Sequence, residues 1–387
     1  MAAVFEVFWR FLLLGCVSFG GPAAHIGYFQ QVFVQRLQWL SAADYAQLVA
    51  LSQFLPGPGS SQVGFALGHR RAGLPGAMAA FVGFTLPSFV LMLGLALFAA
   101  QSAEADWLDG LVRGLKLLAA VVVAEAVRSM AGMFCRHWLG AALAVATGLL
   151  LLWSATAWLS YLALLMAALL GAAFLPAQVD SGPRLAPSAT GLRWLPLVAF
   201  SLLFALLPVL AAVSAEWRLF SQFYHSGSLV FGGGHVVLPL LQQQVGDALS
   251  EDRFLLGYAA AQAVPGPMFS LAAFLGAELL PARPVWGALF TTLAIFLPGF
   301  LLVLGLQTAW SALAARPRVL GLVAGVNAAV VGLLAAAWVN PIAGSALHGW
   351  LDVLLVSAGW AVLLRWRPPI LVLVAAFAGF GLVLGAA

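Results

Sequence analysis

Apolar runs of helical length follow one another along almost the entire chain, separated by short polar turns. Two early runs are interrupted by helix-breaking residues, at Phe19-Gly20-Gly21-Pro22 and at Gln53-Phe54-Leu55-Pro56-Gly57-Pro58. Gly and Pro are the least favourable residues in a helix interior, and a simple membrane crossing needs about 20 uninterrupted apolar residues. The pieces around these breaks are shorter. The pattern therefore predicts half-helices or hairpins packed inside a bundle, at 4–19, 22–38, 42–55 and 59–71.

Longer apolar runs come next and predict transmembrane spans at 74–100, 107–128, 138–153 and 157–175. The polar stretch 176–193 contains Gly182 and Pro183 and predicts a loop that links two halves. One extra span is expected at 194–214. The rest of the chain is expected to form a helix up to a second glycine-rich break, elements at 235–245 and 252–264, a short helix ending at 280, and spans at 284–309, 319–338, 344–364 and 368–384.

This order of elements repeats because the breaks themselves repeat. Phe231-Gly232-Gly233 matches Phe19-Gly20-Gly21, and Gln262-Ala263-Val264-Pro265-Gly266-Pro267 matches the stretch from Gln53 to Pro58. Further pairs agree in the same order: Leu40-Ser41 with Leu249-Ser250, Leu86-Pro87 with Leu297-Pro298, and Gly110-Leu111-Val112 with Gly321-Leu322-Val323. The sequence therefore predicts two related halves, 1–180 and 194–387, joined by a linker at 181–193, with 194–214 as the extra span.

Composition places the chain in a membrane. Hydrophobic residues make up 63% of the 387 residues and charged residues 8%, whereas a soluble domain carries about 25% charged residues. We therefore expect an all-α polytopic membrane protein. The basic residues fall mostly in loops, which indicates the positive-inside rule and no nucleic-acid binding. Cys16 and Cys135 lack the spacing of a metal or redox site, and we expect neither a metal nor a cofactor.

Loop charges predict how the two halves are oriented. In the first half, the loop before 107–128 is acidic and the loop after it is basic. In the second half this order is reversed, because Arg316 and Arg318 stand where the acids stood. Basic loops face the cytoplasm, so the halves are predicted to have inverted topology. The N-terminus and the linker would be cytoplasmic and the C-terminus external.

Inverted repeats bring their broken helices together near the middle of the bilayer. At each break a helix begins with free N–H groups and the positive end of its dipole, which bind anions without a buried cation. A small tetrahedral oxyanion accepts hydrogen bonds on all sides and suits such a site, whereas a metal cation would need carboxylates, which the breaks lack. The candidate substrate-binding residues of the breaks are Gly20, Gly21, Pro22, Gln53, Pro56, Gly57, Pro58, Gly232, Gly233, Gly234, Gln262, Pro265, Gly266 and Pro267.

Polar side chains near the breaks extend this candidate site. Hydroxyl donors follow the Pro-Gly-Pro motifs, histidines follow the glycine-rich motifs and can bind an anion or a proton, and one lysine within 107–128 can attract an anion. These residues are Ser60, Ser61, Ser270, His25, His235 and Lys116. The simpler alternatives are helix kinks, serines bonded to their own helix, histidines that only pack, and a charged side chain that reaches back to the interface.

These motifs resemble those of the chromate ion transporter family of bacterial membrane proteins, in its long two-domain form. The resemblance rests on Ser18-Phe19-Gly20-Gly21-Pro22 with His25, on Gln53 with Pro56-Gly57-Pro58, and on their second copies, and it covers nearly the whole chain. It implies export of chromate across the bacterial inner membrane, with sulfate as a chemically similar competitor. Gly234 departs from the pattern, because the first copy has Pro22 there, and this loosens the second helix start.

Energetics favour export as the direction of transport. A dianion that leaves a negative-inside cell gains about 4.6 kcal/mol per 100 mV, twice the value for one charge. Proton exchange through His25 or Glu125 remains open as a further driving force, and the sequence contains no phosphate-binding loop for ATP. Two alternatives remain: a transporter of the same fold for sulfate or another oxyanion, and an intramembrane enzyme such as a lipid phosphatase. The expected partners are chromate, sulfate as its competitor, the lipid bilayer and a second copy in a homodimer.

Overall fold

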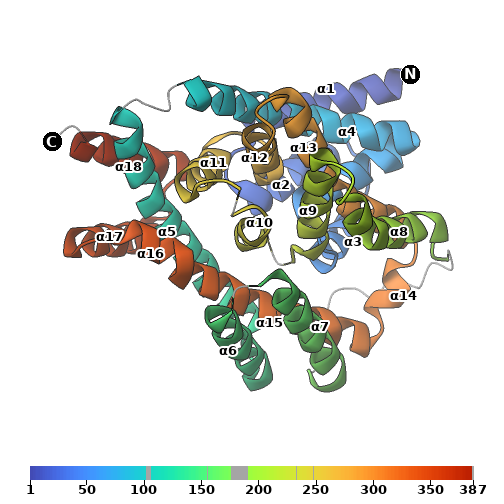
Figure 1. Ribbon diagram of the computed structural model, residues 1–387. Coiled ribbons are helices and arrows are strands. Elements are labelled where there is room, and N and C mark those ends of the chain that lie inside the picture. Colours follow the sequence, from blue (N-terminus) through green and yellow to red (C-terminus); the bar gives the residue numbers. More distant parts are fainter. Residues whose placement is uncertain (102–105, 155, 176–190, 232, 247, 386–387) are drawn as a thin grey trace.

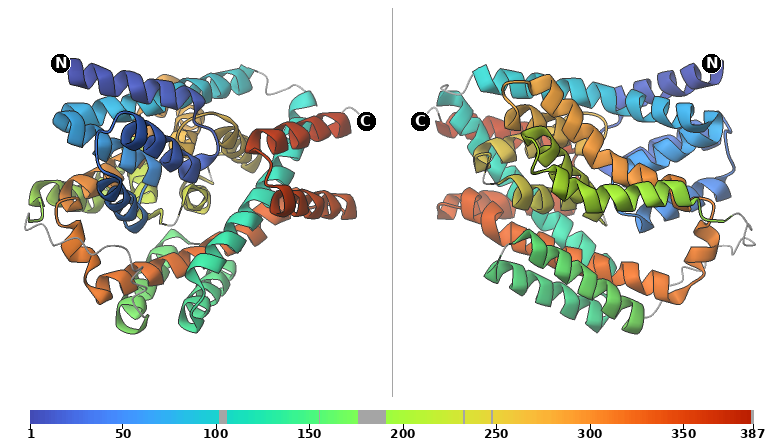
Figure 2. Two further views of the ribbon diagram at one scale, coloured as in Figure 1. Left: turned by 180° about the vertical axis from the view of Figure 1, so that it is seen from behind. Right: turned by 45° about the vertical axis from the view of Figure 1, so that its right-hand side comes forward.

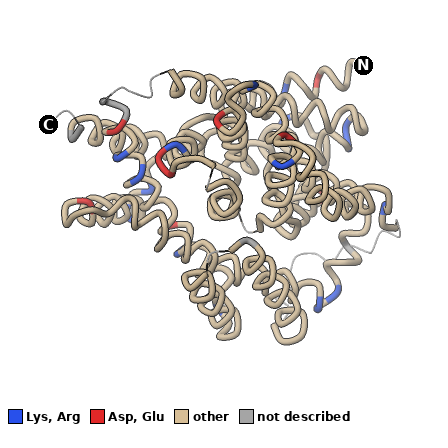
Figure 3. Tube along the Cα trace, in the orientation of Figure 1, with Lys and Arg blue, Asp and Glu red and all other residues tan. Residues whose placement is uncertain are grey.

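The computed structural model describes residues 1–101, 106–154, 156–175, 191–231, 233–246 and 248–385, and these ranges form helices and no strands (Figure 1). Four of the described helical segments are long and apolar enough to cross a membrane: Gly59–Gln101, Asp109–Phe134, Pro284–Leu306 and Pro317–Ala346. Charged residues are sparse along the tube in Figure 3, and large apolar side chains such as Leu149 and Leu195 are exposed. The protein is an all-α polytopic membrane protein, as predicted.

Both breaks of the first half lie where the sequence predicts them. The helices before and after them are α1 (Ala2–Val17), α2 (Gly21–Phe29), the π-helix η1 (Gln30–Arg36), α3 (Ala42–Phe54) and α4 (Gly59–Gln101). Ser41 caps α3, because its side chain accepts a hydrogen bond from the N–H of Asp44 (3.0 Å). α4 contains the predicted elements 59–71 and 74–100 as two helices, because the backbone is non-helical at Ala72 and Gly73 and the second helix packs back against the first, with Gly68 against Gly76.

In the first half, the helix before each break and the helix after it have their outer ends at the same end of the bundle. Glu6 near the start of α1 pairs with Arg71 (2.9 Å), and the Arg71 guanidinium lies over the ring of Trp39, just after η1. Asp44 at the start of α3 pairs with Arg70 (3.6 Å). The outer ends of these helices therefore lie together. The chain forms two helical hairpins whose breaks are inside the bundle.

The second half repeats this arrangement. Its helices are α8 (Trp194–Leu210), α9 (Ala215–Leu229), η2 (Gly234–Val236), α10 (Val237–Val245), α11 (Glu251–Ala263), η3 (Met268–Ser270), α12 (Leu271–Leu279) and α13 (Pro284–Leu306). Gln222 of α9 donates a hydrogen bond to the carbonyl of Gln244 at the end of α10 (2.7 Å). Arg253 at the start of α11 pairs with Glu278 at the end of α12 (3.6 Å). Both of these pairs of helices are therefore helical hairpins as well.

The remaining helices interlock the two halves. They are α5 (Asp106–Phe134), α6 (Trp138–Trp153), α7 (Ala157–Phe174), α14 (Trp310–Ala314), α15 (Pro317–Ala337), η4 (Trp338–Ala343), α16 (Gly344–Ala346), α17 (Trp350–Trp366) and α18 (Ile370–Gly385). α15 packs against α6 and α7 of the first half, and α5 packs against α17 and α18 of the second (Figure 1). Glycines make these contacts close, because a Cβ on Gly332 would clash with the carbonyl of Ala144.

Two sequence expectations differ from the structure. The expected span 344–364 is two elements, α16 and α17, because the backbone is extended at Leu347 and Gly349. The carboxylate of Asp352 in the first turn of α17 accepts a hydrogen bond from the N–H of His348 in this connection (3.0 Å). The expected span 284–309 ends at Leu306, and the short helix α14 was not predicted. Residues 181–190 of the predicted linker lie outside the described residues. Figure 2 shows the two termini at opposite sides of the molecule.

Candidate functional site

Each Pro-Gly-Pro break is hydrogen-bonded to the glycine-rich break of the other half. The N–H of Gly57 donates to the carbonyl of Val230 (2.7 Å), and the N–H of Gly266 donates to the carbonyl of Ser18 (2.9 Å). Ser18 and Val230 hold matching positions, since each directly precedes the phenylalanine of its glycine-rich motif. The same contact is thus made twice.

His25 extends this network in the first half. It is fully buried in α2 and lies between Ser18 and Ser60. A carbonyl can only accept, so Nε2 donates to the Ser18 carbonyl (3.2 Å), and Nδ1 accepts from the Ser60 hydroxyl (3.2 Å). Because the Ser18 carbonyl also accepts from Gly266, a continuous chain of contacts joins three of the four breaks. The hydrogen bond from Gly57 to Val230 connects the fourth break, the glycine-rich break of the second half.

Glycine is required at the centre of both Pro-Gly-Pro breaks. Gly57 has a φ of +121° and Gly266 a φ of +100°, backbone conformations that other residues rarely adopt. A Cβ on Gly57 would lie 3.1 Å from the Cα of Gly299 in α13, and one on Gly266 would lie 3.0 Å from the Oγ of Ser88 in α4. Each break is therefore pressed against the transmembrane helix of the opposite half, next to the matched prolines of α4 and α13.

Gln62 is a site residue that the sequence analysis missed. It is fully buried in the first turns of α4. Its Nε2 donates to the carbonyls of Pro56 (2.8 Å) and Gly299 (3.3 Å). The amide therefore connects the Pro-Gly-Pro break of the first half to α13 of the second half. The predicted Gln53 is exposed, and the Nε2 of Gln262 is buried without a hydrogen-bond partner among the described residues. The sequence signal that could have identified Gln62 is its position near the start of the helix that follows Pro56.

Several buried donors near the breaks have no protein partner in the part of the chain that the structure describes. Ser61 and Ser270 occupy matching positions after the two Pro-Gly-Pro motifs, are 4% and 0% exposed, and have unpaired hydroxyls. The hydroxyls of Ser18 and Thr85 are also unpaired. Buried polar groups are normally hydrogen-bonded, and leaving one unpaired costs about 1–3 kcal/mol. These atoms are therefore available to a ligand or to water.

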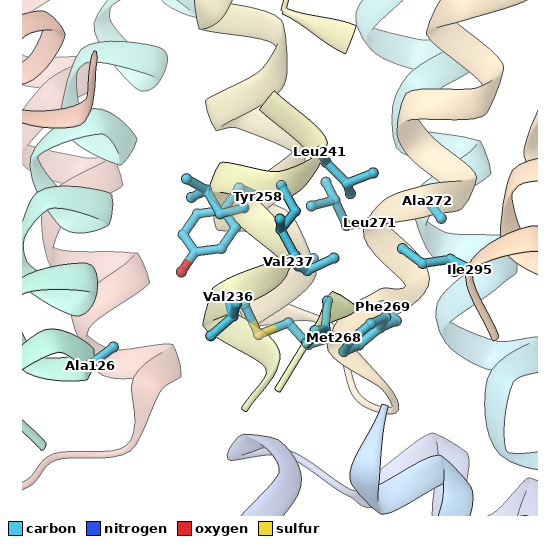
Figure 4. Packing of buried hydrophobic residues seen from close by; sticks show 14 of the residues in the cluster. Ala126, Val236, Val237, Leu241, Tyr258, Met268, Phe269, Leu271, Ala272 and Ile295 are labelled. Carbon is cyan, nitrogen blue, oxygen red and sulfur yellow. The ribbon is translucent and has the colours of Figure 1, made fainter. Parts of the chain in front are cut away.

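The second glycine-rich break is packed from one side. The Nδ1 of His235 is hydrogen-bonded to the hydroxyl of Tyr258 in α11 (2.9 Å), and a Cβ on Gly234 would lie 3.1 Å from the Sδ of Met268. Figure 4 shows the side chains of Val236 and Val237 beside Met268. η2 and η3, which follow the two breaks of the second half, are thus neighbours. The predicted site residue Gly232 lies outside the described residues.

Lys116 is not brought to the breaks. Its ammonium pairs with the carboxylate of Asp252 at the start of α11. Gln262 and the break lie at the other end of α11, about 15 Å away at 1.5 Å per residue. The ion pair also neutralises much of the charge that was expected to attract an anion. Lys116 therefore connects α5 to α11 in this conformation.

Two cavities occur away from the breaks. One, of about 480 Å³, lies between α5, α15 and α17, and the other, of about 360 Å³, lies between α5, α6 and α15. Both are lined almost entirely by apolar side chains. Arg128 at the edge of the larger cavity is held by a bidentate pair with Glu125 (2.6 and 2.8 Å). An oxyanion would find few free donors there, so the region of the breaks is the better candidate site.

The chain matches known proteins along almost its whole length. The chromate transporter family matches residues 5–172 and 217–381. A probable chromate transport protein of Synechococcus elongatus is 26% identical over 377 residues, which cover 95% of this chain and 93% of that protein. Chromate transport proteins of Cupriavidus metallidurans and Pseudomonas aeruginosa are each 29% identical, over 84% and 87% of this chain and 80% of each relative.

No solved structure matches the chain. The family match includes both copies of the glycine-rich motif and both copies of the Pro-Gly-Pro motif, since Phe19, Pro58, Phe231 and Pro267 all lie within the matched ranges. It leaves out residues 1–4, 173–216 and 382–387, and the internal stretch includes α8. The chain belongs to the chromate transporter family.

Proposed function

We propose that this protein exports chromate, which it binds as a small tetrahedral oxyanion where the four breaks meet. The observation that carries the proposal is the reciprocal pair of hydrogen bonds, Gly57 to Val230 and Gly266 to Ser18. These bonds bring the starts of α2, α4, η2 and η3 into one region, where free N–H groups favour an anion. The unpaired hydroxyls of Ser61 and Ser270 add donors. The names of three relatives, which are chromate transport proteins, support chromate as the ion.

The membrane potential supplies the driving force in this proposal. Outward movement of a dianion is favourable by about 4.6 kcal/mol per 100 mV. In the test, cells that express the protein accumulate less labelled chromate than control cells, and de-energised cells lose this difference. Equal accumulation in expressing and control cells would refute export. Sulfate has the same shape and charge, so a transporter for sulfate is the second candidate, and sulfate flux in the same cells separates the two.

We also propose that residues 1–180 and 194–387 are inverted repeats, with 181–193 as a cytoplasmic linker. The matched contacts of the four breaks support this. So does the reciprocal packing in which α5 contacts α17 and α18 of the second half, while α15 contacts α6 and α7 of the first. The N-terminus is then expected in the cytoplasm and the C-terminus outside. A fluorescent protein fused at residue 1 and alkaline phosphatase fused after residue 387 should both be active. Activity of the phosphatase only when it is fused at the N-terminus would contradict this orientation.

Removing the unpaired serine hydroxyls should weaken substrate binding without destabilising the fold. Ser61→Ala and Ser270→Ala are each expected to raise the KM for chromate about tenfold or more, since one hydrogen bond to a charged group contributes about 1.5 kcal/mol or more. Thermal stability should not fall, because neither hydroxyl has a protein partner among the described residues. Ser60→Ala is the matched control, because its hydroxyl bonds to His25 and its loss should lower stability. An unchanged KM in both variants would remove these serines from the site.

A further inference from the structure

The two hydrogen bonds that join the halves define two junctions with the same backbone contact. We call the contact of Gly266 with Ser18 the first junction and the contact of Gly57 with Val230 the second. In both, the N–H of the central glycine of a Pro-Gly-Pro motif donates to the carbonyl that precedes a glycine-rich motif. The two junctions therefore differ mainly in their side chains.

The helices beside the junctions also pack in the same way. A Cβ on Gly15 in α1 would clash with the carbonyl of Phe84 in α4, and a Cβ on Gly227 in α9 would clash with the carbonyl of Ile295 in α13. Each glycine lies three residues before the junction carbonyl, and each carbonyl lies two residues before the Leu-Pro pair of its helix. The side chains around the two junctions can therefore be compared position by position.

The first junction has hydroxyl groups where the second has apolar side chains. Ser18 corresponds to Val230, and Thr85 corresponds to Phe296. All four side chains are buried. The hydroxyls of Ser18 and Thr85 have no hydrogen-bond partner in the described part of the chain, whereas Phe296 packs against neighbouring phenylalanine rings. The halves thus share a backbone contact but differ in the donors that they offer a ligand.

Three unpaired hydroxyls border the first junction, each from a different segment. Ser18 bonds directly to Gly266 through its carbonyl. A Cβ on Gly266 would lie 3.3 Å from the carbonyl of Phe84, the residue before Thr85 in α4. η3 ends with Ser270 and packs against α4. The chain end of α1, the middle of α4 and η3 therefore each direct one free donor group to this region.

The second junction has already used its strongest donor. The Nε2 of Gln62 donates to two backbone carbonyls, and its Oε1, which has no partner among the described residues, would repel an anion. Ser226 in the last turn of α9 has a buried hydroxyl without a described partner. Ser61 lies between the two junctions, because Ser60 beside it bonds to His25 on the side of the first junction.

We propose that the oxyanion binds at the first junction, with Ser18, Thr85 and Ser270 as hydroxyl donors, and that the second junction is a structural contact that positions α4. An oxyanion inside the bilayer needs hydrogen-bond donors in place of its water, because unpaired polar groups are costly there. The first junction supplies several such donors and the second is largely apolar. This inference rests on the proposed function, because it assigns the contacts of the same ion.

The KM for chromate in liposomes tests the assignment. Ser18→Ala and Thr85→Val each remove one hydroxyl with little change in shape, and each should raise KM about tenfold or more. Thr85→Ser keeps the hydroxyl and should keep KM near the wild-type value. Ser226→Ala is the matched control at the second junction and should leave KM unchanged. An unchanged KM in both Ser18→Ala and Thr85→Val, or an equal rise in Ser226→Ala, would overturn the proposal.

Thermal stability of the detergent-solubilised protein gives a second readout that does not depend on transport. Saturating chromate should raise the Tm of the wild type by mass action, by less in Thr85→Val, and by the wild-type amount in Ser226→Ala. Without chromate, Thr85→Val should be as stable as the wild type, because its hydroxyl has no described partner; a clear loss would show a structural role and overturn the assignment. Stabilisation that depends on Thr85, in a wild type that transports no chromate, would refute the proposed function and leave the ion site standing.

Discussion

Replacing Gly57 or Gly266 by valine is expected to abolish chromate transport while the protein still folds. Both glycines have a positive φ, and a Cβ at either position would lie closer than van der Waals contact to the transmembrane helix of the other half. A non-glycine residue in such a conformation costs about 1–3 kcal/mol, and displacing the break also breaks its hydrogen bond across the halves. A combined effect of about 3 kcal/mol on the binding-competent state corresponds to a loss on the order of a hundredfold.

The matched control is Gly94→Val in the lipid-facing part of α4. No atom lies within 4 Å of a Cβ built on Gly94, and the residue is exposed. This variant should transport at close to the wild-type rate. Size-exclusion chromatography of fluorescently tagged protein measures the folded amount of each variant, and transport is compared per folded molecule. Wild-type transport by both Gly57→Val and Gly266→Val would show that the breaks do not form the site.

Gln62→Leu is expected to be the most destabilising single change near the breaks. Leucine nearly fills the same space but leaves the carbonyls of Pro56 and Gly299 buried without the Nε2 donor. Two lost hydrogen bonds with buried acceptors amount to about 2–4 kcal/mol. The temperature at which the detergent-solubilised protein loses its monodisperse peak should fall clearly, and transport should fall with it because the first break is no longer tied to α13.

Gln53→Leu provides the comparison. The Gln53 side chain is exposed, so its replacement should change thermal stability by no more than about 0.5 kcal/mol, as surface substitutions usually do. The two glutamines lie on either side of the same break, and the sequence analysis favoured Gln53 because it has a matching partner, Gln262. A larger loss of stability in Gln53→Leu than in Gln62→Leu would contradict the hydrogen bonding described for Gln62.

The repeated motifs predicted the breaks correctly because helix interruption is a local property. Pro and Gly disfavour a helix through their own backbone, whatever the surrounding fold, so α2 begins within the first motif, at Gly21, and α4 begins directly after Pro58. The Ser41 cap was predictable for the same reason, since a cap and its N–H donor are three residues apart. The failure at 344–364 has the opposite cause. Both parts of that segment are apolar, and hydropathy alone does not show where one helix ends and the next begins.

The sequence by itself determined the membrane-embedded helical class, the positions of the four breaks and the repetition of their motifs, because each depends on composition or on residues close in the chain. Only the tertiary structure decided that each break bonds to the opposite half, that Gln62 rather than Gln53 holds the Pro56-Gly57-Pro58 break, and that Lys116 is paired with Asp252. These contacts join segments that are distant in the chain or lie on different helices. Packing brings them together, and no local spacing or periodicity in the sequence records such a meeting.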